Sequence, residues 1–343
     1  MNRGWMRAGT LLGILLACGP AMAGAQTCTT QAGMTSVLRD ELSSEAMNLA
    51  QRVKEGAAAK VQADTIAEFA SGTSFAPTES LVQSTSARVA SDELRVTQIY
   101  ELDASSRQAG DTSEADFSCP LLGTTAEVDF AIPGLPRGLY GFAMVEATGS
   151  HPWLLAFLLR RDGGVWKLAG FYPRARAVGG HDGLWYWKSA RTYSKADELW
   201  LAWVFYGEAD ELLRPANFVT STDLELLRTE RRAAAPPELL NGIGPSNPLV
   251  VKATGQAGGV AEYRFTSIAA EASEDGQRLN LALHVEGNPS SDSTAAAAQS
   301  KAAAQALLDA HIELRQAFHN VLVFMDVAGR EPLVTEETIS SIP

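Results

Sequence analysis

Metal-ligating side chains are scarce in this sequence. It contains three cysteines and five histidines in 343 residues. The cysteines form no pair at metal-ligand spacing, and the histidines form neither a His-x-His pair nor a Glu-flanked couple on one helix. Zinc and iron sites take several such ligands, usually at short and regular spacing. The sequence therefore predicts no metal site.

Signatures of nucleotide binding and acyl transfer are absent as well. The chain has no Gly-x-Ser-x-Gly, no Gly-x4-Gly-Lys phosphate loop and no dinucleotide-binding glycine pattern. His181 and Asp182 adjoin in "GGHDG" (179–183), but Asp182 stands where a helix N-cap is expected. We therefore favour a structural role for this pair and predict no catalytic residue and no cofactor.

Positive charge is in short supply. The chain has 28 Lys and Arg against 40 Asp and Glu, a net charge of −12. Its densest basic stretch, "LRTERR" (227–232), is short. Nucleic acids and anionic membranes are bound through clustered Lys and Arg that neutralise phosphates. Neither is an expected partner.

No apolar run is long enough to span a bilayer as a helix. The run "GTLLGILLA" (9–17) follows two arginines and precedes Gly19-Pro20 and "AMA" (21–23), which is typical of a secretory signal peptide. We predict a signal peptide at 1–23, cleavage before Gly24, and a bacterial protein that is periplasmic or secreted, with no transmembrane segment after cleavage. The alternative takes "LLAC" (15–18) as a lipobox, with Cys18 lipidated and the protein held at the outer membrane.

Removal of the leader leaves Cys28 and Cys119 as an even pair. Oxidising compartments favour disulfides between such cysteines. We predict that Cys28 and Cys119 are bonded.

Two helices and then a sheet are predicted for the first half of the chain. Apolar residues fall at helical spacing over 34–70. Short runs with strand character follow at 94–102, 125–132, 139–147, 153–159 and 165–172, separated by turn sequences such as "RRDGG". We expect a curved antiparallel meander. In "WLLAFLL" (153–159) both alternating sets of side chains are apolar, so both faces of that strand must be covered.

Two helices, a curved sheet and the terminal hairpin "LLAFLLRRDGGVWKLAGFY" resemble the nuclear transport factor two-like superfamily, a cone-shaped α+β fold, over about residues 34–173. The resemblance implies a pocket between sheet and helices, which serves catalysis in some members and binding alone in others. Enzyme members of the superfamily place acidic, Tyr or His residues in the pocket, and the candidates here are Asp129, Glu146 and Tyr140 on predicted strands, with His151 in a turn. No spacing links them into an acid–base set, so the resemblance does not carry catalysis over.

Residues 182–215 return to helical spacing twice and resemble a single tetratricopeptide repeat. The matching positions are Tyr186, Ala190, Tyr193, Ala202, Tyr206, Ala209 and Pro215. A lone repeat cannot bury its own faces, and there is no second copy. We therefore expect a helical hairpin docked on the sheet domain.

Four of the seven tryptophans lie in this hairpin: Trp185, Trp187, Trp200 and Trp203. Large aromatic side chains dominate cores, so the main interpretation is that these rings pack the hairpin onto the sheet. The alternative is that Trp185 and Trp200 are partly exposed and contact a protein, peptide or glycan.

The sequence predicts an α+β protein with two folded units. A Pro- and Ala-rich linker at 233–248 separates a cone-shaped domain (24–175) and its hairpin with an extension (176–232) from a small α+β domain (249–343). That domain has strands at 260–272 and 278–287, a helix at 293–319 and a strand at 321–327, in the order β-β-α-β.

We expect an exported, non-enzymatic binding or assembly protein that takes an envelope protein, a peptide or a small ligand. The predicted binding residues are the four tryptophans of the hairpin with Tyr140, Asp129 and Glu146. The competing hypothesis is a hydrolase or isomerase that uses the last three as acid–base groups in the sheet pocket. A third is the lipoprotein anchored through Cys18.

Overall fold

The computed structural model describes residues 26–254, 259–273, 276–287, 293–327 and 329–342. The predicted leader and both of its alternative processing sites lie outside these residues. The described chain is an α+β protein, as the sequence predicts, with seven α-helices and four β-sheets in the described ranges.

A five-stranded antiparallel sheet forms the centre of the N-terminal half. Its strand order is β1-β2-β5-β6-β7. The strands are β1 Thr27–Thr30, β2 Glu93–Asp103, β5 Leu139–Thr148, β6 Trp153–Asp162 and β7 Val165–Ala175. The β6–β7 turn uses Gly163 and Gly164, both at positive φ (59° and 88°), which is why "DGG" marks a hairpin in the sequence.

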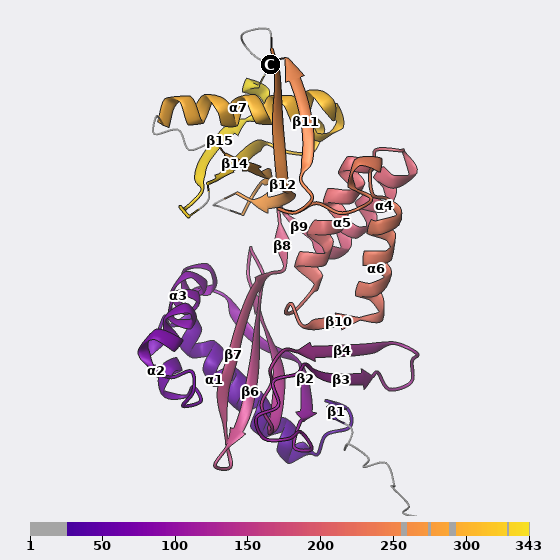
Figure 1. The fold of residues 1–343 in the computed structure, drawn as a ribbon. Coiled ribbons are helices and arrows are strands. Elements are labelled where there is room, and N and C mark those ends of the chain that lie inside the picture. The colour runs from indigo at the N-terminus through magenta and orange to yellow at the C-terminus, as the bar shows by residue number, and fades with distance from the viewer. Residues whose placement is uncertain (1–25, 255–258, 274–275, 288–292, 328, 343) are drawn as a thin grey trace, which may run out of the picture.

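Three helices cover one face of this sheet (Figure 1). They are α1 Ser36–Lys54, α2 Ala58–Ala63 and α3 Gly72–Val89. Thr35 caps α1 by accepting a hydrogen bond from the Leu38 amide at 3.3 Å. The helix approaches the sheet at Gly141, where a Cβ atom would lie 2.4 Å from the Leu42 side chain. Leu42 and Phe157 are fully buried in the apolar cluster at this interface.

A second, smaller sheet covers the opposite face. Its order is β10-β4-β3, from β10 Val219–Ser221, β4 Glu127–Ile132 and β3 Ala115–Pro120. Phe130 of β4 packs edge-on against Tyr100 and Phe142 of the large sheet, at centroid distances of 5.1 and 5.2 Å. Both faces of β6 are therefore covered, as its sequence predicts. The prediction that 125–132 belongs to the same meander is wrong, because β4 pairs with β3 and β10 instead.

The disulfide between Cys28 and Cys119 is confirmed, with the two Cα atoms 5.2 Å apart. It joins β1, at the edge of the large sheet, to β3 of the small sheet. The bridge therefore fixes the two sheets to each other at one end of their shared core.

The helical hairpin predicted at 182–215 consists of α4 Gly183–Lys195 and α5 Leu199–Leu213. A two-stranded ribbon precedes it, β8 Ala177–Val178 and β9 His181–Asp182. Asp182 is the N-cap of α4 and accepts a hydrogen bond from the Trp185 amide at 2.8 Å. A third helix, α6 Thr222–Ala233, follows with Ser221 as its N-cap and packs along α5.

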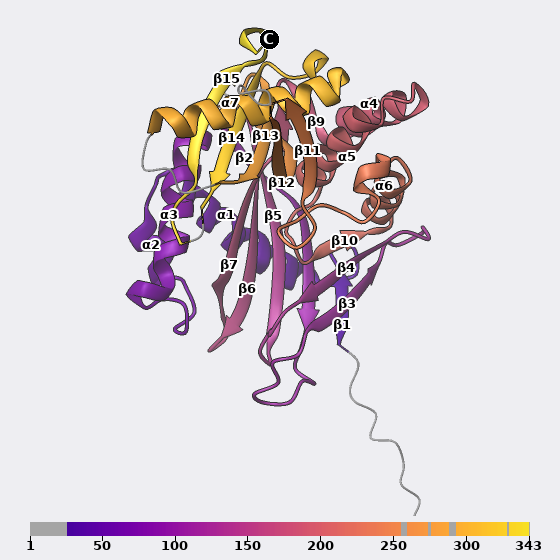
Figure 2. The same ribbon diagram turned by 45° about the horizontal axis from the view of Figure 1, so that its top comes forward.

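The C-terminal sheet has five strands in sequential order, β11 to β15. They are β11 Leu249–Thr254, β12 Val260–Ala272, β13 Leu279–Glu286, β14 Asn320–Asp326 and β15 Leu333–Thr338. The helix α7 Ser293–Ala310 connects β13 to the parallel β14 and lies across the sheet (Figure 2). The sequence missed β11 and β15, so the order is β-β-β-α-β-β and not β-β-α-β.

The hairpin packs against the C-terminal sheet and shares its core. Residues 200–206 of α5 are all buried, so this helix needs partners around its whole circumference. Phe265 of β12 and Leu307 of α7 belong to the same apolar cluster as α5. The expectation that the hairpin docks on the N-terminal sheet domain is corrected: only one end of it reaches that sheet, and the main contact is with β12.

The segment predicted as a linker at 233–248 also belongs to this core. It contains a short 3-10 helix, Pro237–Leu239, and Ala234 and Leu239 are buried in the shared cluster. Residues on both sides of the segment therefore pack together. Among the described helices none is long and apolar enough to cross a membrane.

We expect removal of the disulfide to destabilise the N-terminal half without unfolding the shared core around α5. The bridge closes a segment of 91 residues, so its loss in the Cys28→Ser, Cys119→Ser double variant should lower the free energy of unfolding by about 2–5 kcal/mol. Thermal unfolding with and without reductant measures this. A reductant effect that persists in the double variant would contradict the assignment.

Candidate functional site

Three of the four hairpin tryptophans are core residues. Trp187, Trp200 and Trp203 are 9%, 4% and 8% exposed, whereas Trp185 is 39% exposed. The expected burial therefore holds for three rings, but these rings belong to the cluster shared with the C-terminal sheet. The prediction of a partly exposed Trp200 is wrong, because this ring packs against His311 at a centroid distance of 3.9 Å.

The rings have specific polar partners. Trp187 donates its Nε1 hydrogen to Glu230 at 2.7 Å, and the Arg191 guanidinium lies 4.6 Å above the ring. Trp185 stacks on His181 at a centroid distance of 3.6 Å. The Arg231 guanidinium lies over the Trp203 ring, 4.3 Å from the ring centroid.

Asp129, Glu146 and Tyr140 do not meet in one site. Glu146 forms an ion pair with Arg95 at 3.0 Å, and the Tyr140 hydroxyl donates to the Pro136 carbonyl at 2.9 Å. Both lie on β5, six residues apart, which is roughly 20 Å along a strand. Asp129 lies on β4 in the small sheet. The geometry gives the acid–base hypothesis no common centre.

Apolar side chains of α1, α2 and α3 pack against the large sheet, where the sequence resemblance implies a pocket. An apolar cavity of about 240 Å³ lies on the opposite face, where Trp187 and Leu213 of the hairpin meet Tyr100 and Phe142 of the sheet.

A larger cavity, of about 600 Å³, lies between α5, α6, the segment 235–243 and β12. We call it the α5–α6 cleft. Its apolar wall contains Trp203, Val204, Leu239 and Ile268. Its charged groups are Glu208, Asp210 and Glu211 of α5 and Arg231 and Arg232 of α6. The volume suits a small organic ligand.

One wall of the α5–α6 cleft is the edge of a strand. β11 pairs with β12 only up to Phe265, and the β12–β13 register shifts between Phe265 and Ser267. The wall is formed by residues 267–270, just beyond this point. Within the described residues no strand pairs with that edge, so its main-chain groups border the cleft.

Glu208 is the most unusual group in the cleft. It is 6% exposed, and within the described part of the chain its carboxyl group has no hydrogen bond and no ion pair. Burial, together with the neighbouring charges of Glu211 and Glu271, raises its pKa to about 8. At neutral pH the carboxyl is therefore mostly protonated.

Arg231 lacks an acidic partner as well. Its guanidinium lies over Trp203 and against Gly207, where a Cβ atom would be 3.0 Å from an Nη atom. Its buried Nε has no hydrogen-bond acceptor in the described structure. Burial lowers the pKa of Arg231, and the charges of Asp210 and Glu211 oppose this. A guanidinium nonetheless stays charged at neutral pH.

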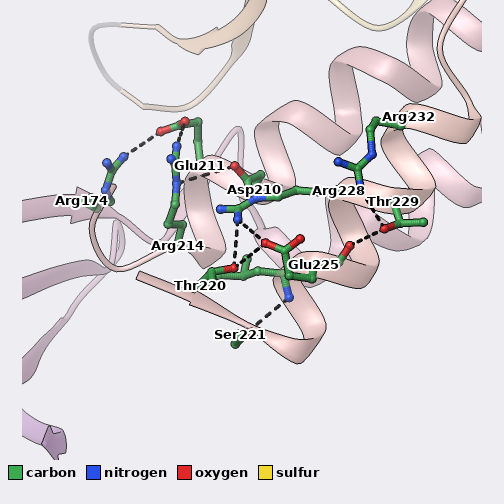
Figure 3. Close-up of polar contacts among 11 residues, drawn as sticks. Arg174, Asp210, Glu211, Arg214, Thr220, Ser221, Glu225, Arg228, Thr229 and Arg232 are labelled. Atoms are coloured by element: carbon green, nitrogen blue, oxygen red, sulfur yellow. Dashed lines mark hydrogen bonds and ion pairs between the residues drawn. The ribbon is translucent and has the colours of Figure 1, made fainter. Parts of the chain in front are cut away.

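The acids nearest to Arg231 are already engaged (Figure 3). Asp210 pairs with Arg228 at 3.1 Å and with Arg214 at 3.6 Å. Glu211 pairs with Arg174 at 2.7 Å and also with Arg214. This network links α5 to α6 and β7 beside the cleft. Asp210 and Glu211 are thus paired with other arginines, and neither forms an ion pair with Arg231 in the described structure.

No family model, curated protein or solved structure matches this chain. The resemblances to the nuclear transport factor two-like superfamily and to the tetratricopeptide repeat therefore remain predictions. In the described ranges no group of three or more His, Cys, Asp and Glu side chains is placed to hold a metal ion.

Sequence reasoning missed Glu208 and Arg231. One signal was present: Glu208 follows nine residues of α5 that hold no charged residue, "LWLAWVFYG" (199–207). A carboxylate on an otherwise apolar helix indicates either a surface turn or an enclosed charge. Only the packing of α6 and β12 decides between the two.

We expect Glu208 to make stability fall as pH rises. Its pKa is 4.5 in a model peptide and about 8 in the fold, so the native state binds more protons than the unfolded state between these values. Glu208→Gln should remove this fall. Its free energy of unfolding should exceed that of the wild type by roughly 2–5 kcal/mol above pH 8 and equal it near pH 4.5. Denaturant unfolding at several pH values measures it. In the matched control, Glu271→Gln, most of the fall should remain.

Trp200 and Trp185 should differ sharply in their effect on stability. Trp200→Ala removes a buried ring and should lower the free energy of unfolding by about 3–5 kcal/mol. Trp185→Ala removes a 39% exposed ring and should lower it by about 1 kcal/mol or less. Urea unfolding of the two variants compares them directly. Equal losses would contradict the burial described here.

Proposed function

We propose that this protein is an exported, non-enzymatic binding protein that holds a small polar ligand in the α5–α6 cleft. The observation that carries the proposal is Glu208, an enclosed carboxyl group without a protein partner on the wall of an open cavity. A buried, unsatisfied carboxyl destabilises the fold. A ligand that satisfies it recovers that free energy as binding affinity.

The cleft is built on rigid elements, which suits binding. Trp203, Gly207 and Glu208 lie on α5, whose other faces are locked into the shared core. The ion-pair network of Figure 3 holds α6 against α5. A site held in this way loses little free energy to ordering when a ligand enters.

Export is supported by the disulfide, because such bonds persist in oxidising compartments. The net charge of −12 gives no basis for nucleic acid as the ligand. We place the protein in the periplasm or outside the cell. Anchoring through Cys18 is the alternative.

The apolar cavity beside Trp187 is a weaker candidate. It is less than half the size of the α5–α6 cleft, and its wall holds mainly aromatic and aliphatic side chains. The Trp187 indole already has its hydrogen-bond partner in Glu230. No group there lacks a partner in the way that Glu208 does.

A thermal-shift screen tests the proposal. The wild type is heated with millimolar free amino acids, small amines, small carboxylates and monosaccharides, each alone. We expect one of these classes to raise the melting temperature, because a ligand that binds only the native state stabilises it.

The shift in melting temperature should be lost in Glu208→Gln and kept in the control Glu271→Gln, since Glu208 lines the cleft and Glu271 does not. Glu208→Gln should fold well because it removes a buried ionisable group. The proposal is wrong if no class shifts the wild type, or if Glu208→Gln responds as the wild type does.

A further inference from the structure

The α5–α6 cleft encloses a carboxyl group and a guanidinium that do not pair with each other. Glu208 and Arg231 both line it, yet the described structure contains no ion pair between them. Oppositely charged side chains that share a buried site normally pair or leave it. An ionisable carboxyl group and a guanidinium that both lack partners therefore indicate a ligand that brings an opposite charge for each.

From this arrangement we infer that the ligand of the α5–α6 cleft is a small zwitterion, a molecule with an ammonium and a carboxylate group such as a free amino acid. This inference rests on the proposed function and names the ligand class. Glu208 binds the ammonium group, and Arg231 binds the carboxylate through its fork of N–H donors.

The fold places Arg231 for this role. Gly207 precedes Glu208 on α5, and the absence of a side chain there admits the guanidinium close to the helix. The ring of Trp203, one helical turn earlier, supports the guanidinium from the other side. The cation is therefore held near Glu208 without neutralising it, and Asp210 and Glu211 are engaged by other arginines.

The rest of the α5–α6 cleft fits the remaining parts of such a ligand. Val204, Leu239 and Ile243 offer an apolar surface for a side chain. The uncovered edge of β12 at 267–270 offers main-chain donors and acceptors. A single-charge ligand would leave either Glu208 or Arg231 buried without a partner.

Ammonium binding has a second consequence at neutral pH. Glu208 is mostly protonated in the free protein and must ionise to pair with an ammonium group. The charges that act on it are those of Glu211 on its own helix and Glu271 on β12. Asp210, Arg231 and Arg232 also line the cleft. Binding should therefore release about one proton per ligand.

Calorimetry with three related probes tests the inference at pH 7. L-leucine carries both charges, 3-methylbutylamine lacks the carboxylate, and 4-methylpentanoate lacks the ammonium group. We expect leucine to bind roughly 10- to 100-fold more tightly than either analogue. Titrations in phosphate and in Tris should differ in apparent enthalpy for leucine and the amine, because a proton passes to the buffer, and should agree for the acid.

Variants assign the two charges. Glu208→Gln should lower the affinity for leucine to that of the wild type for 4-methylpentanoate. Arg231→Met keeps an aliphatic stem against Trp203 and should lower the affinity for leucine to that of the wild type for 3-methylbutylamine. Lys188→Gln, an exposed site on α4, is the matched control for loss of a positive charge and should change nothing.

The outcomes separate this inference from the proposed function. If the amine or the acid alone binds as tightly as leucine, the cleft is a binding site but the ligand is not a zwitterion. If the screen finds only monosaccharides, the zwitterion is again excluded while the binding role stands. If no probe of any class binds, both are wrong. Leucyl-leucine in place of leucine tests a wider spacing of the charges: tighter binding supports a zwitterionic peptide.

Discussion

The burial of α5 on all sides is the constraint on which the rest of the C-terminal half depends. A helix that is apolar around its circumference cannot rest on one surface. It is enclosed by α4, α6, the proline-rich segment and β12, so that the hairpin and the described part of the C-terminal sheet share one apolar cluster. The charged end of the helix is where this enclosure meets the cleft, and Glu208 lies at that boundary.

The α5–α6 cleft holds two ionisable side chains without protein partners in the described part of the chain. Elsewhere charges near α5 are paired, as Asp210, Glu211 and Glu230 are with arginines. Glu208 and Arg231 are enclosed and left without partners. Unsatisfied polar groups persist in folded proteins mainly where function requires them. The local cost in stability is therefore the strongest physical argument that the cleft binds something.

The aromatic density of the hairpin has a structural explanation that also prepares the site. Trp200 and Trp187 fix α5 and α4 in the core, and each has a polar or ring partner. Trp203 has two roles: it is buried in the core, and its ring packs against the Arg231 guanidinium at the cleft. The pattern predicts packing correctly for these rings. It could not separate the one that also supports a charge, because that depends on α6, which approaches from 28 residues further along the chain.

Local physics made much of this protein readable from the sequence alone: the glycines of the β6–β7 turn, the Asp182 cap, the need to cover both faces of β6 and the pairing of two cysteines. Each of these depends on neighbouring residues or on simple counting. Only the tertiary structure decided that β4 joins a separate sheet, that the hairpin packs on the C-terminal sheet, and that Glu208 is enclosed rather than solvated. These outcomes depend on contacts between segments far apart in the chain, and no local pattern encodes which partner a strand edge or an apolar helix face will find.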